Sequence, residues 1–72
     1  MKERIEAWTY HQGYKKVYVE SRYLMERIKK LKDSILSSTY YQTGKIRPIG
    51  WDFIISIKLF SKVKKMGNVV NI

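Results

Sequence analysis

The sequence contains no cysteine and only one histidine among its 72 residues. Without cysteine the chain has no disulfide, no thiolate zinc site and no cysteine nucleophile, and it suits a reducing compartment such as the cytoplasm. The single histidine, His11, lies beside an expected turn, with no carboxylate or nucleophile at a catalytic spacing. Phosphate-binding loops and serine nucleophile motifs are absent too. We therefore expect no catalysis, metal, cofactor or small-molecule substrate.

Long apolar runs are also missing. No uncharged apolar stretch is longer than that of Phe53 to Ile55, which suits a strand, whereas a membrane-spanning helix needs ~20 apolar residues. The first residues, MKERIEAW, lack the apolar core of a signal peptide. We expect a cytoplasmic protein with no membrane partner.

Acidic residues are scarce. Six Asp and Glu stand against fifteen Lys and Arg, which gives a net charge of +9. A field of this sign on so small a chain favours a polyanionic partner such as DNA, RNA or an anionic membrane surface. The alternative is a lysine-rich coat that only keeps the protein in solution.

The first half of the chain predicts a β-hairpin followed by a helix. Residues 4–11 alternate in polarity as a strand does, Gln12-Gly13 suits a tight turn, and residues 15–20 form the return strand. Ser21 is a suitable N-cap for a helix over residues 22–36. The apolar stripe of this helix recurs at helical spacing: Leu24, Ile28, Leu31 and Ile35.

The second half predicts the same order of elements. A strand begins over residues 39–42, a proline-containing loop follows at 43–50, and a strongly β-prone strand covers 51–55. A second helix is expected over residues 57–66, ended by a glycine and an asparagine. The last four residues, 69–72, add a short strand or fray.

The two halves resemble each other, which predicts an internal duplication. A shift of 35 residues superposes Ser21 on Ser56 and the lysine pair Lys29-Lys30 on Lys64-Lys65. It also aligns the helix stripes and places Tyr18 on Phe53. The alternative is that any two hairpin-and-helix units in a lysine-rich chain look alike.

The expected fold is a single α+β domain over residues 1–72, with the order ββα-ββα and pseudo-repeats 4–36 and 38–67. Each unit is too small to be stable alone. We predict that they share one core, in which a four-stranded, mainly antiparallel sheet carries both helices on one face.

Aromatic residues gather in the two hairpins. Trp8, Tyr10 and Tyr18 fall on the strand face opposite the aliphatic residues, together with Lys16. If the aliphatic face packs on the helices, these aromatics form a platform for stacking unpaired bases, worth ~1–3 kcal/mol per base. A dimer interface would use the same aromatics.

The loop at 43–50 is the second candidate surface. Lys45 and Arg47 stand at its tip, where Arg could read a base edge while Ile or Pro wedges a base step. In the alternative, its isoleucines fold back onto the core. The other candidate nucleic-acid contacts are Lys15, Lys16, Gln12, Gln42, Lys29, Lys30, Lys64 and Lys65.

These features predict a small basic protein that binds nucleic acid without catalysis, DNA ahead of RNA. The alternative is a protein-interaction module, such as a small viral or plasmid accessory or inhibitor protein that docks on a larger partner through its aromatic face. A homodimeric structural protein is the third possibility. The sequence does not decide which face binds.

Overall fold

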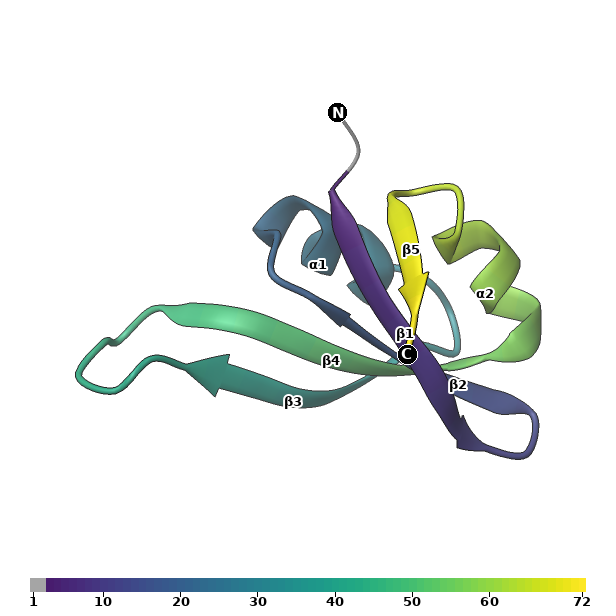
Figure 1. The fold of residues 1–72 in the computed structure, drawn as a ribbon, viewed down its shortest axis with the longest axis horizontal. Coiled ribbons are helices and arrows are strands. Elements are labelled where there is room, and N and C mark those ends of the chain that lie inside the picture. Colours follow the sequence, from purple (N-terminus) through teal and green to yellow (C-terminus); the bar gives the residue numbers. More distant parts are fainter. Residues whose placement is uncertain (1–2) are drawn as a thin grey trace.

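The computed structural model describes residues 3–72, which form a five-stranded mixed sheet and two helices (Figure 1). The strands lie in the order β3-β4-β2-β1-β5, and every neighbouring pair is antiparallel except β1 and β5. Neither helix of this region is long and apolar enough to cross a membrane. In chain order the elements are β1 (Arg4–His11), β2 (Tyr14–Val19), α1 (Arg22–Lys29), β3 (Ile35–Tyr41), β4 (Pro48–Ser56), α2 (Ile57–Val63) and β5 (Asn68–Asn71).

One face of the sheet packs against both helices and forms the core. Because side chains alternate along a strand, every second residue of β1, β2 and β4 points to this side. Burial of each larger apolar side chain stabilises the fold by roughly 1.5–3 kcal/mol. The buried apolar residues are Ile5, Ala7, Val17, Val19, Leu24, Ile28, Trp51, Phe53, Ile55, Phe60 and Val63.

The first hairpin and both helix starts are confirmed. Gly13 has a φ of 84° in the turn between β1 and β2, a conformation that glycine adopts without strain. The Ser21 hydroxyl accepts a hydrogen bond of 3.2 Å from the amide of Leu24. The Ser56 hydroxyl accepts one of 3.3 Å from the amide of Leu59, so the two caps are built alike.

The first helix is shorter than predicted, and the prediction of helix over residues 22–36 is wrong beyond its first half. The helix ends at Lys29, and the hydroxyl of Ser34 donates to the carbonyls of Ile28 and Leu31, both at 2.8 Å, in the turn that follows. Asp33 has a φ of 72° there, which no helix tolerates. The segment that follows, β3, is rich in β-branched and aromatic residues, so pairing with β4 outweighs the apolar stripe.

The second unit also differs in its boundaries. Its first strand starts at Ile35 rather than residue 39, and β4 already begins at Pro48, so the expected loop at 43–50 is shorter. The second helix ends at Val63 rather than at residue 66. The tail forms a strand, β5, which pairs parallel to β1, with the register Ile5 to Val69.

The sheet therefore has five strands and mixed direction, where four mainly antiparallel strands were predicted. The predicted duplication is not matched in detail either. Shifting by 35 residues places Tyr18, which points away from the helices, on Phe53, which is fully buried. A strand shifted by one residue exchanges its faces. The 35-residue shift superposes the two serine caps, but it does not superpose the faces of the strands that precede them. Glu20 lies between the end of β2 and its cap, Ser21, whereas Ser56 is both the last residue of β4 and the cap of α2.

Candidate nucleic-acid interface

The sheet has an open face, opposite the helices, which carries Trp8, Tyr10, Lys16, Tyr18, Tyr40 and Asp52. Register fixes this placement, since Trp8 pairs with Lys16 and Tyr18 pairs with Asp52 across the neighbouring strands. The predicted stacking residues thus share one face. Tyr10 is 52% exposed, and Trp8 and Tyr18 are half-buried.

Several aromatic rings on the open face contact each other or neighbouring charges. Tyr18 and Tyr40 meet edge to face, with ring centroids 5.6 Å apart and an interplanar angle of 72°. The Tyr18 ring also lies directly over Gly50, where a Cβ would meet it at 2.6 Å. The ammonium group of Lys16 sits 5.3 Å from the centroid of Tyr10. These contacts occupy ring surface that a base would need for stacking.

A buried carboxylate lies in the middle of the open face. Asp52 is 2% exposed, and its Oδ2 accepts a hydrogen bond from the Tyr40 hydroxyl. The ammonium of Lys16 stands 4.0 Å from the same oxygen, while Oδ1 has no hydrogen-bond partner within residues 3–72. This bond to Asp52 raises the pKa of Tyr40. Sequence reasoning missed this residue, although a lone carboxylate between Trp51 and Phe53 in an apolar strand was a signal for it.

Charges on the open face nearly cancel. Lys16 is close to Asp52, and the Arg4 guanidinium lies 3.5 Å from the Glu6 carboxylate. Because phosphate attraction needs a net positive field, the aromatic platform is poorly placed to hold a nucleic-acid backbone.

The excess positive charge lies instead with the helices. Residues 57–66 contain four lysines and no acidic residue. We call Lys58, Lys62, Lys64 and Lys65 the α2 lysines; all four are exposed. Of these, Lys64 and Lys65 were predicted as contacts and the other two were not.

Lys15 joins the α2 lysines from the sheet. It pairs with the buried Ile55, so its side chain points to the helix side. Its ammonium lies 4.8 Å from the ring centroid of Phe60, and that of Lys64 lies 5.6 Å from the same ring. Two predicted contacts far apart in sequence thus converge, whereas Lys16, the neighbour of Lys15, points to the opposite face.

The other predicted lysine pair ends the first helix. Lys29 is the last residue of α1 and Lys30 is its C-cap, and both are exposed. Cations at this position interact favourably with the helix dipole. The nearby Glu26 carboxylate pairs with Arg22 at 3.6 Å.

The β3–β4 hairpin extends beyond the body of the protein as an arm, which we define as residues 40–50 (Figure 1). At its tip, Gly44 has a φ of 80° and the amide of Lys45 donates to the carbonyl of Gln42 at 2.9 Å. Lys45 and Arg47 are exposed, and Ile46 between them is 93% exposed. Ile46 therefore does not fold back onto the core.

Gln12 and Gln42 do not form a matched pair. Both are exposed, in the β1–β2 turn and at the arm tip respectively. Because β2 and β4 are antiparallel neighbours, the two hairpins point in opposite directions, and their turns lie at opposite ends of the molecule (Figure 1).

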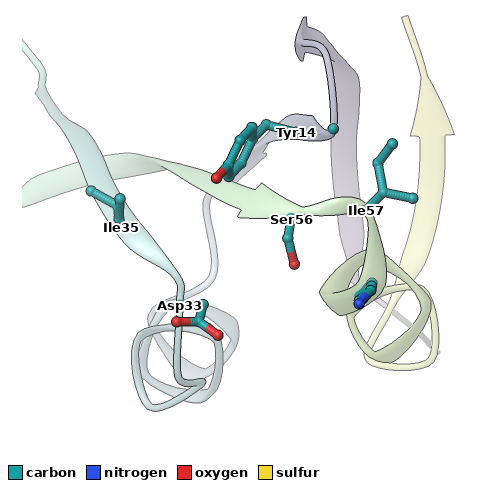
Figure 2. A pocket seen from close by; sticks show the side chains of 7 residues that line it. Tyr14, Asp33, Ile35, Ser56 and Ile57 are labelled. Atoms are coloured by element: carbon teal, nitrogen blue, oxygen red, sulfur yellow. The ribbon is translucent and has the colours of Figure 1, made fainter.

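A shallow hollow lies beside the end of β4, beyond the point where β3 begins. Figure 2 shows Asp33 and Ile35 on one side of this hollow and Ser56 and Ile57 on the other, with Tyr14 of β2 above β4.

Within residues 3–72, no three His, Cys, Asp or Glu side chains gather in a way that could hold a metal ion.

Comparisons with protein-family models, curated proteins and solved structures found no match to this chain.

Proposed function

We propose that this protein binds duplex DNA without catalysis, by inserting the arm into a groove. The observation that carries the proposal is the arm tip, where an isoleucine that is 93% exposed stands between two cations, Lys45 and Arg47. Exposing a whole isoleucine side chain to water is unfavourable by about 1.5–3 kcal/mol, so an occupant that buries it would recover this energy. DNA-binding proteins that kink the duplex use the same arrangement, in which an apolar side chain is inserted between base steps and neighbouring cations contact the phosphates.

Groove dimensions favour DNA over RNA. The major groove of B-DNA is wide enough for a two-stranded β-ribbon, and its minor groove can be opened by an apolar wedge. The major groove of A-form RNA is deep and narrow, and its minor groove is shallow. A two-stranded arm with an apolar tip therefore fits DNA better.

The α2 lysines and Lys15 supply the long-range attraction. Their charge is not neutralised by acids in the same segment. Contact with about five phosphates would give a slope near −4.5 for log affinity against log salt concentration.

The first experiment measures binding by fluorescence anisotropy to random duplex DNA, single-stranded DNA and duplex RNA at several salt concentrations. We expect duplex DNA to bind most tightly, with a steep salt dependence. Replacing both Lys45 and Arg47 by Ala should reduce the slope by about 1.8 if each contacts one phosphate. A flat salt response for the unmodified protein would refute the proposal.

The second experiment tests the wedge itself. In Ile46→Ser, we expect DNA bending, measured by energy transfer between dyes at the duplex ends, to fall while the salt slope stays unchanged. Ile57→Ser is the matched control, because Ile57 is also exposed, at 56%, but lies at the start of α2. If both variants and the unmodified protein bend DNA equally, Ile46 does not act as a wedge.

A second candidate function uses the open face. Its balanced charge and clustered aromatics suit a protein partner better than a polyanion. Under this proposal the chain is an interaction module docked on a larger protein. A complex that survives nuclease treatment and high salt, and that is lost in Tyr10→Ala but retained in Ile46→Ser, would support it. Loss of the complex at high salt would count against it.

A further inference from the structure

The two edges of the sheet are protected to different degrees. The β5 edge is four residues long, with an asparagine at each end. The β3 edge is seven residues long and has β4 on one side only. An edge strand presents unpaired N–H and C=O groups that can pair with another extended chain.

Apart from register shifts, the β3 edge lacks the features that usually prevent such pairing. Residues 34–44 contain no charged residue and no proline, in a chain that is 29% charged. Ile35 and Tyr41 are 59% and 57% exposed. Two irregularities are present: the register with β4 shifts between Leu36 and Ser38, so Ser37 is an extra residue of β3, and again between Tyr40 and Tyr41, where Ile49 is an extra residue of β4. A bulge of this kind interrupts an edge locally.

Between the two shifts, the stretch from Ser38 to Tyr40 pairs with β4 in regular register. We propose that a second copy of this chain pairs with it, β3 against β3 in antiparallel direction, about a twofold axis at Thr39. This interface is inferred from the uncharged edge of β3 and does not rest on the proposed DNA binding. It would join two five-stranded sheets into one continuous sheet.

Charge and symmetry identify the occupant as a second copy. Two chains of charge +9 repel each other, so contact is favoured where charge is absent, and residues 34–44, which include β3, are the longest uncharged segment of the sequence. An antiparallel pair of identical strands closes under a twofold axis, so no further edge is left to grow into a fibre through β3.

The register follows from the faces of the strand. Residues that pair directly must lie on the same face, and Ser38 and Tyr40 both lie on the open face. An axis at Thr39 places Ser38 opposite Tyr40 of the second copy and Thr39 opposite itself, a favourable cross-strand pair.

A cysteine scan tests this register cleanly, because the chain has no cysteine of its own. We expect Thr39→Cys to form cross-linked dimers under mild oxidation faster than Ser38→Cys or Tyr40→Cys. Ser61→Cys, on the exposed surface of α2, is the control and should stay monomeric. Cross-linking that is equally fast at Ser61→Cys would overturn the proposal.

The unmodified protein provides an independent measurement if a variant fails to fold. In sedimentation equilibrium the apparent mass should double as protein concentration rises, and amide hydrogen exchange over residues 38–41 should slow in parallel. A monomer at every concentration up to about 1 mM, with unchanged exchange, would refute the interface.

Discussion

Gly67, just before β5, is a position where a small change should have a large structural effect. A Cβ atom added there would lie 2.5 Å from the carbonyl oxygen of Glu3 and 2.9 Å from Cδ1 of Ile5. The first of these is a backbone atom and the second belongs to a fully buried side chain, so neither can move freely. Gly67→Ala must therefore push β5 away from β1.

The cost can be worked from the contacts at this position. The Glu3 carbonyl accepts a hydrogen bond of 2.7 Å from the amide of Asn68. Losing it would cost about 1–3 kcal/mol. Overpacking against Ile5 would add about 1–3 kcal/mol, and the lower chain entropy of unfolded alanine would return up to about 1 kcal/mol. We expect Gly67→Ala to lower the free energy of unfolding by about 1–6 kcal/mol, against a total of roughly 4–11 kcal/mol for a chain this size.

Urea denaturation measures this change, and hydrogen exchange locates it. The amides of Asn68 and Ile72, which donate to Glu3 and Ala7, should lose protection before those of the central strands. Gly13→Ala is the control: its added Cβ meets nothing within 4 Å, and only the positive φ is unfavourable, so it should cost about 1–2 kcal/mol. A Gly67→Ala protein within 0.5 kcal/mol of the original, at about the resolution of such measurements, would show that the β1–β5 contact yields and that the reasoning is wrong.

Two further predictions concern the caps and the open face. Ser21→Ala and Ser56→Ala should each lower the free energy of unfolding by about 1 kcal/mol, measured by urea denaturation, because each removes the acceptor for one helix amide; no change in either would contradict the shared cap geometry. Burial raises the pKa of Tyr18, and the hydrogen bond to Asp52 raises the pKa of Tyr40. Both hydroxyls therefore stay protonated to a higher pH in the folded state than in the unfolded state. The stability that these protonated hydroxyls contribute is present below about pH 10 and falls as the pH rises through the folded pKa values. In a protein with both tyrosines replaced by Phe, the free energy of unfolding, measured by denaturation from pH 8 to 11, should fall less steeply with pH.

Local signals in the sequence were sufficient for the first hairpin and for the starts of both helices. The alternation over residues 4–11, the glycine turn and the two serine caps depend on neighbours within four positions, and the structure has them as predicted. The common face of Trp8, Tyr10 and Tyr18 followed from the same alternation, because every second residue of a strand lies on one face.

The second half shows where local signals fail. Ile35 fits both a helical stripe and a β-branched strand, and only the presence of β4 at hydrogen-bonding distance decides for the strand. The tail likewise becomes a strand because the outer edge of β1 is free to accept it. Neither partner is visible from the residues around Ile35 or Val69.

The candidate interface divides in the same way. The sequence alone determined the net charge, the basic loop with Lys45 and Arg47, and the absence of cysteine chemistry. Only the tertiary structure placed the aromatics and the excess positive charge on different surfaces. It also brought Lys15 and Lys64 to the same ring, that of Phe60, and left Ile46 exposed at the end of the arm. The physical reason is that periodicity assigns a side chain to a face of its own element, whereas the pairing of elements decides which faces meet and which stay in water.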